Sequence, residues 1–201
     1  MKLITEYLSI KVNLSKIVPK DDGEDLRNIV RSELERLGKS ANLNHINVSK
    51  ITNFKRVFYL KNFTGDISQW DMRSAINTDS MFAGNTNFNP DYLGEWKFTQ
   101  LKNANHMFAA CYHFNGIGLR NWNVETVEDF SYMFVSCEDF NEDISSWKVN
   151  NAKTLEKMFE NTQSFDQDLS SWKISKYCPM IDAFKNSKMN RKKNHFPTRI
   201  Y

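Results

Sequence analysis

Residues 140–149 read FNEDISSWKV, and variants of this stretch return along most of the chain. The tryptophan marks the period. The five tryptophans are 26, 26, 25 and 25 residues apart, at Trp70, Trp96, Trp122, Trp147 and Trp172. An aliphatic residue stands three positions before each of them, and another apolar residue stands two positions after. A bulky residue that recurs at a nearly fixed interval indicates that one structural unit has been copied.

Further columns of residues keep step with the tryptophans. A phenylalanine precedes each tryptophan by seven or eight positions, at Phe63, Phe88, Phe114, Phe140 and Phe165. A Met-Phe pair follows by eleven and twelve positions in the first four copies, and the fifth has Ala183-Phe184. An earlier, degenerate copy has Ile46 at the tryptophan position. The sequence therefore predicts about six units.

Each unit begins like a leucine-rich repeat, with the pattern aliphatic-x-x-Trp-x-apolar. Side chains alternate along a strand, so Trp147 and Val149 are expected to point inward and Lys148 and Asn150 outward. A short helical or turn segment follows at residues 153–159, with apolar residues at i, i+3 and i+4 on one face. One unit cannot bury its apolar face alone, so neighbours must stack. The predicted fold class is an α/β repeat: a leucine-rich-repeat-like solenoid of about six coils of 25–26 residues, each a short parallel strand plus a short helix or turn.

Three regions follow from this pattern. Residues 1–42 are expected to form an N-terminal strand, at 8–14, and a capping helix, at about 23–37, with Gly38 as its stop signal. Residues 43–184 form the solenoid. Residues 185–201 form a basic C-terminal cap or tail, because they contain four lysines and two arginines.

Length and composition narrow the class of protein. The 201 residues suit one domain, and a net charge of +3 with 25% charged residues is close to balance. No stretch approaches the roughly 18 apolar residues of a membrane span. The N-terminus lacks the continuous apolar core of a secretory signal, so we expect a cytoplasmic protein, or a surface or secreted one if a leader has been removed.

The cysteines and histidines form no recognisable catalytic or metal-binding motif. Cys111 and Cys137 fall in the same column of neighbouring units, which predicts two small buried side chains; a disulfide or a metal site is the alternative. His106 and His113 lie near Cys111 in sequence, but both sit at positions that the repeat already explains. We therefore expect no metal and no cofactor.

Acidic residues also fit structural roles. Asp21, Asp22, Glu24 and Asp25 precede or open the predicted helix, where a helix N-terminus favours negative charge. Asp66, Asp143 and Asp168 recur as a column of the repeat, which is typical of a structural role. No phosphate-binding loop, dinucleotide fingerprint, zinc-protease motif or C-x-x-C is present. The sequence predicts a protein that is not an enzyme.

The columns Phe-Asn-x-Asp-Ile-Ser-x-Trp-x-Val and Met-Phe resemble the BspA-type leucine-rich repeat family, also described as a domain of unknown function common in mycoplasmas and gut bacteria. The resemblance covers about residues 16–189. It implies a right-handed solenoid without known catalytic activity, and many relatives are surface proteins, some of them adhesins. The chain departs from typical members at residues 1–15, which add the predicted strand and carry no leader. Small leaderless relatives are expected to act inside cells, or as phage- or plasmid-borne inhibitors of a host protein.

The remaining functional signal lies on the predicted surface. Positions beside the tryptophan column vary from unit to unit, which fits a tailored contact surface and equally a solvated face. The leading hypothesis is a protein–protein interaction module that uses the strand face or one end, with an acidic surface as the favoured partner. Nucleic-acid binding through the basic C-terminus ranks below it, because the tryptophans are expected to be buried. The candidate partner-binding residues are Gln69, Asp71, Arg73, Lys97, Asn123, Glu125, Lys148, Asn150, Lys173, Arg191, Lys192 and Lys193.

Overall fold

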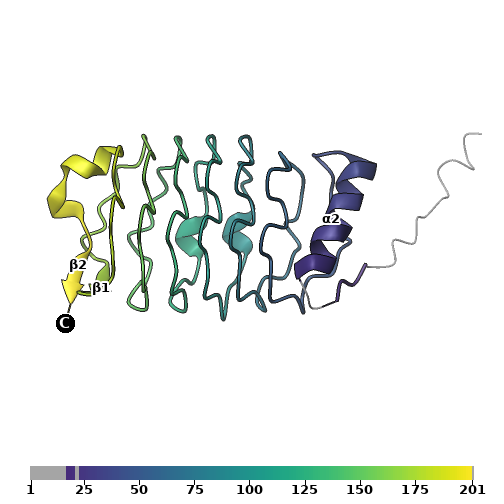
Figure 1. Cartoon of the computed structure of the whole chain (residues 1–201), viewed down its shortest axis with the longest axis horizontal. Helices are drawn as coiled ribbons and strands as arrows, with labels where there is room; N and C mark the ends of the chain where they lie inside the picture. Colours follow the sequence, from purple (N-terminus) through teal and green to yellow (C-terminus); the bar gives the residue numbers. More distant parts are fainter. Residues whose placement is uncertain (1–16, 21–22, 201) are drawn as a thin grey trace, which may run out of the picture.

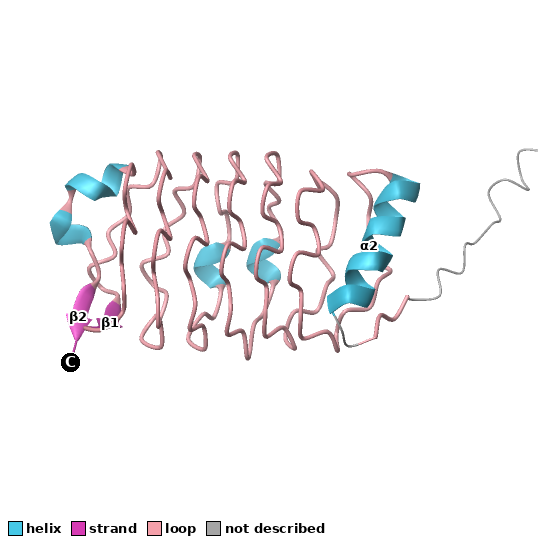
Figure 2. Ribbon diagram, in the orientation of Figure 1, coloured by secondary structure: helices cyan, strands magenta, loops and turns pink. Residues whose placement is uncertain are grey.

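The computed structural model describes residues 17–20 and 23–200. The chain runs as a row of coils that lie side by side along the long axis, with helix α2 (Gly23–Leu37) at one end and the C-terminus at the other (Figure 1). Most of each coil is loop or turn (Figure 2). The short elements are 3-10 helices η1 (Leu93–Glu95), η2 (Leu119–Asn121), η3 (Lys188–Arg191) and η4 (Lys193–His195), and strands β1 (Lys173–Ser175) and β2 (Thr198–Ile200). The predicted strand at 8–14 lies outside the described residues.

Helix α2 occupies the span that the sequence predicts for a helix. Its buried face carries Leu26, Val30 and Leu34 at helical spacing. Gly38 ends it with φ of +87°, and the Gly38 N–H donates to the Leu34 carbonyl at 2.9 Å. Arg27 fixes the helix on the first coil, since its Nη1 donates to the Lys55 carbonyl at 2.9 Å. The end coil is thus covered, as a stack of repeats requires.

Backbone hydrogen bonds join the coils at what we term the turn segments, residues 54–61, 78–85, 104–111, 130–137, 155–162 and 180–187. At every junction, four alternate N–H groups of one segment donate to carbonyls of the next coil, three of them within its turn segment and one on the residue just before it. The Phe82 N–H, for example, donates to the Met107 carbonyl at 2.9 Å. The N–H groups in between bond within their own coil, as Ala83 does to the Ser80 carbonyl at 3.2 Å.

Each turn segment holds two residues at positive φ, four positions apart. They are Arg56 and Leu60, Ser80 and Gly84, His106 and Ala110, Tyr132 and Ser136, Lys157 and Asn161, and Asp182 and Asn186. Of the two forms that the apolar spacing allows for residues 153–159, a short helix or a turn, the structure therefore has turns. A succession of turns buries the same residues, and Leu155, Met158 and Phe159 are each at most 1% exposed.

The strands expected beside the tryptophans are also largely absent from the described residues. Only β1, directly after Trp172, is a strand, and it pairs in parallel with β2. Elsewhere the coils meet in isolated parallel bridges, such as Asn77 with Asn103. The coils also meet in the core, where the Phe82 and Phe108 rings of neighbouring coils stack at 5.6 Å.

The core consists of stacked aromatic columns. All five indoles are buried, with exposed fractions from 1% to 4%. Four of them donate their N–H to a carbonyl of the preceding coil, as Trp122 does to Leu93 at 2.7 Å. Trp96 is the exception, because its buried N–H has no hydrogen-bond partner among the described residues. The sequence prediction of an interior tryptophan column is confirmed by this burial.

A second buried column closes five of the six turn segments with a small donor: Asn85, Cys111, Cys137, Thr162 and Ser187. The Cys111 thiol donates to the Phe82 carbonyl at 3.2 Å, and the Cys137 thiol donates to the Phe108 carbonyl at 3.0 Å. Both cysteines are free and fully buried. The predicted small buried side chains are confirmed, and their added role is to satisfy a backbone carbonyl of the coil before.

The aspartates that recur in one column of the repeat, among them Asp66, stabilise turns, as their recurrence predicts. Asp66, Asp143 and Asp168 each accept the backbone N–H of the residue two positions on, at 2.8 to 3.0 Å. These hydrogen bonds lower the pKa of Asp143 and of Asp168 below the usual value. The column is part of the scaffold.

Candidate binding surfaces

The face beside the tryptophan column is exposed along the stack. Alternation around each buried indole turns the neighbouring side chains outward. The predicted residues Gln69, Arg73, Lys97, Asn123, Glu125, Lys148, Asn150 and Lys173 are all exposed. Asp71 is half-buried, and its carboxylate pairs with the Arg73 guanidinium at 2.7 Å. A hydrogen bond from Arg73 holds the pKa of Asp71 below its usual value.

Two lysines give the face positive charge in the later coils. Lys148 and Lys173 follow Trp147 and Trp172, whose rings stack at 6.2 Å, so the two lysines occupy the same position in neighbouring coils. Both are exposed, and neither makes an ion pair with another residue in the described part of the chain. Asn123 instead accepts the Glu125 N–H at 3.1 Å and shapes its own turn.

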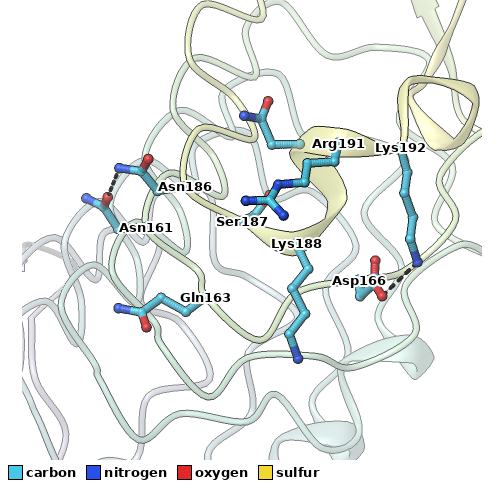
Figure 3. Close-up of a pocket in the computed structure, with 9 residues that line it drawn as sticks. Asn161, Gln163, Asp166, Asn186, Ser187, Lys188, Arg191 and Lys192 are labelled. Carbon is cyan, nitrogen blue, oxygen red and sulfur yellow. Dashed lines mark hydrogen bonds and ion pairs between the residues drawn. The ribbon is translucent and has the colours of Figure 1, made fainter.

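The C-terminal end carries an open depression of about 820 Å³ (Figure 3). It lies between the last two coils and η3, and it is lined by Asn161, Gln163, Asp166, Asn186, Ser187, Lys188, Asn190, Arg191 and Lys192. A hydrogen bond of 2.8 Å links Asn186 to Asn161 across its wall. The lining is polar, with three basic residues, one acidic residue and five uncharged ones.

The cations of this depression differ in their partners. Lys192 pairs with Asp166 at 2.8 Å between Nζ and Oδ2. Lys188 and Arg191 reach over the hollow in Figure 3, and no carboxylate pairs with either within the described ranges. The other oxygen of Asp166, Oδ1, is buried without a hydrogen-bond partner. The depression thus offers two free cations, several amides and one unused acceptor.

The structure brings together two of the three basic residues predicted at this end. Arg191 and Lys192 line the depression, whereas Lys193 turns away and lies over the Phe196 ring at 4.5 Å. Sequence reasoning missed Asn161 and Asn186, which are surface amides at variable positions of the repeat. Both have a positive φ, of +61° and +60°. Asparagine tolerates this conformation better than most residues, and that preference is the one signal in the sequence that could have marked them.

Histidines and cysteines do not converge on a chemical site. His106 stacks on the Tyr132 ring at 4.4 Å, and His113 pairs with Asp139 at 3.0 Å. Burial raises the pKa of the Cys111 thiol to about 12. In residues 17–20 and 23–200, no three histidine, cysteine or acidic side chains gather as metal ligands do.

A family model described as "Mycoplasma protein of unknown function, DUF285" matches residues 25–118 and again residues 93–196. The chain belongs to this family. The two overlapping matches reflect the copied unit, so the protein is a repeat protein. No curated protein and no solved structure matches it. None of the helices in the described residues has the length and apolar character needed to cross a bilayer.

Proposed function

We propose that this chain is a non-catalytic protein–protein interaction module, built as a right-handed, leucine-rich-repeat-like solenoid of the BspA type. It binds the acidic surface of a partner protein through its C-terminal end, with the tryptophan-flanking face of the later coils as a further contact. The work of such a module is done by a fixed surface rather than by a reactive group.

The C-terminal depression carries this proposal. Lys188 and Arg191 stand free above a floor of amide side chains, so an incoming carboxylate finds both charge and hydrogen-bond donors. Arginine is also common among the residues that dominate binding energy at protein interfaces. Because the hollow is open, it suits a protruding acidic loop of a folded partner.

Charge reversal tests the proposal. The double variants Lys188→Glu/Arg191→Glu and Lys148→Glu/Lys173→Glu carry the same change in net charge at two places. Both are used, beside the unaltered chain, as bait for affinity purification with mass spectrometry from the native host. A partner that is lost with the first variant and weakened with the second supports the proposal. Undiminished capture by the first variant would remove the C-terminal end as the binding surface.

A basic end also suits nucleic acid, and a salt titration separates the two functions. Phosphate contacts make affinity fall steeply with salt. The buried indoles cannot stack on bases, so we expect no affinity for single-stranded DNA even at low salt. The family resemblance leaves two settings for a protein partner: an adhesin-like role at a cell surface, or inhibition of a host protein by a phage- or mobile-element-borne factor.

A further inference from the structure

A groove lies at the other end of the stack, between α2 and the first turn segment. Its volume is about 390 Å³, and its lining consists of Glu24, Arg27, Asn28, Arg31, Arg56, Val57, Tyr59 and Lys61. Arg27 and Arg31 come from the helix, whereas Arg56 and Lys61 come from the coil beneath it. The groove therefore exists only because the helix is seated on that coil.

The groove is strongly basic. Four cations face one carboxylate, that of Glu24. Arg27 bonds the Lys55 carbonyl, and Arg31 donates to the Asn28 amide oxygen. Within residues 17–20 and 23–200, no ion pair joins Arg31, Arg56 or Lys61 to an acidic side chain. The guanidinium of Arg56 is held instead over the Tyr59 ring at 5.2 Å.

The first coil is also unusual in exposing large apolar side chains here. Tyr59 and Leu60 are 39% and 61% exposed. In the same two columns the next coils carry Ala83-Gly84 and Ala109-Ala110. Leu60 has φ of +54°, and its side chain extends over Gly84. A leucine held exposed in the left-handed region is costly and is not required by the repeat, which elsewhere uses a small residue or asparagine.

Tyr59 and Leu60 border a second hollow, of about 430 Å³, which continues from the basic groove. Arg56 and Tyr59 line both. Small residues of the next two coils, among them Ala83 and Ala109, line part of it, and the polar side chains of Asp79, Ser80, Asn105 and His106 line the rest. The surface therefore changes along its length from cationic to a mixture of apolar and polar groups.

We propose that this groove docks an acidic segment of a partner protein, with one large apolar side chain seated beside Tyr59 and Leu60. Charge complementarity selects the occupant: Arg31, Arg56 and Lys61, which form no ion pair among the described residues, attract carboxylates. Tyrosine and arginine together are typical of interface hot spots. Residues 1–16 of the chain itself contain three lysines and one glutamate, so they are not complementary to the groove. This site lies at the opposite end from the surface proposed above and is independent of it.

Phage display of random 12-residue peptides on the full chain tests the site. We expect the selected peptides to be rich in Asp and Glu and to contain at least one Leu, Ile, Phe or Trp. A fluorescent copy of one such peptide should bind at least tenfold more weakly to Arg31→Glu/Arg56→Glu. It should lose less than twofold on Lys188→Glu/Arg191→Glu, which carries the same charge change at the other end.

A second variant addresses the apolar part without risk to the fold. Tyr59→Ala/Leu60→Gly copies residues that the next coil already has at these positions. It should weaken the peptide at least threefold while circular dichroism stays unchanged. Selected peptides without acidic enrichment, or equal losses in both charge variants, would overturn the proposal. A labelled oligothymidylate that binds the chain and is lost with Arg31→Glu/Arg56→Glu would reassign the groove to nucleic acid.

Discussion

Replacing Trp122 by phenylalanine should destabilise the protein more than the same replacement of Trp96. Both indoles are almost fully buried, with exposed fractions of 4% and 1%. Both occupy the same column, and their rings stack on each other at 6.4 Å. The two substitutions therefore remove similar apolar volume. They differ in one polar group, because the Trp122 N–H bonds the Leu93 carbonyl at 2.7 Å and the Trp96 N–H bonds no described residue.

The size of the difference follows from that hydrogen bond. A buried hydrogen bond contributes about 0.5–1.5 kcal/mol. The Leu93 carbonyl also accepts the Trp96 backbone N–H at 3.1 Å, so it keeps one partner after Trp122→Phe, and the loss is about 1 kcal/mol. Trp96→Phe removes a buried donor without a partner, which relieves a penalty of about 1 kcal/mol or more. The two variants should thus differ by about 2 kcal/mol.

Urea unfolding followed by far-ultraviolet circular dichroism measures the two free energies without relying on tryptophan fluorescence. Trp147→Phe serves as a third point, since its N–H bonds the Leu119 carbonyl at 2.8 Å and its loss should match that of Trp122→Phe. Equal destabilisation by all three substitutions would refute the reasoning, because the indole hydrogen bonds would then contribute nothing.

Three further predictions concern the core, the thiols and one ion pair. Phe108→Ala should cost about 3–5 kcal/mol, because Phe108 stacks on the repeat phenylalanines of both neighbouring coils. Phe184→Ala should cost less, because Phe184 stacks on one such phenylalanine, Phe159, and meets Phe196 of the C-terminal segment on its other side. Cys111, whose pKa burial raises to about 12, should not react with a disulfide reagent at pH 8 until urea unfolds the chain. Glu33→Gln should lower the free energy of unfolding at pH 7, and this effect should shrink as the pH falls below about 4.5. A hydrogen bond from Arg36 holds the pKa of Glu33 below its usual 4.5, so its contribution is present above that value and disappears on acidification.

Each of these three predictions has a control in the same part of the structure. Equal losses at the central and terminal phenylalanines would show that unfolding is governed by one coil rather than by the number of neighbours. Cys137 should behave as Cys111 does, because burial raises its pKa too, and fast labelling of either in the folded protein would contradict the packing. Glu35→Gln changes an exposed position on the same helix and serves as the matched control. An effect of Glu33→Gln that stays constant as the pH falls through the acid range would argue against the ion pair.

The register of the core was predictable, whereas the path of the backbone between core residues was not. Spacing alone places Trp147 and Val149 inside, since a residue that recurs in every copy must meet its own copies in the stack. The positions i, i+3 and i+4 of Leu155, Met158 and Phe159 fit a helix and a series of turns equally well. The turns prevail because N–H groups of each coil bond the next coil, a contact between residues about 25 positions apart that no local pattern reveals.

The candidate sites divide in the same way. Alternation around the indoles predicts the exposed Lys148 and Lys173 from sequence. The C-terminal depression and the groove under α2 depend on how end segments settle on the outer coils, which the repeat does not encode. The pairing of Lys192 with Asp166 and the position of Arg31 near Arg56 follow from that seating.

In the turn segments, the hydrogen bonds between coils run in the same direction at every junction: the earlier coil donates its N–H groups and the later coil accepts them. Their peptide dipoles therefore add along the molecule, much as they do in an α-helix, instead of cancelling as in an antiparallel sheet. Backbone bonds outside these segments run the other way, as from the Asn77 N–H to the Thr52 carbonyl, and offset part of this sum. At the α2 end, the carbonyl groups of the first turn segment have no earlier coil to accept from, and the Arg27 guanidinium donates to that of Lys55. At the other end, the N–H groups of the last turn segment have no later coil to donate to. Each inserted copy would add one more set of aligned bonds in the turn segments, so the orientation of longer engineered versions in an electric field should strengthen with the number of copies.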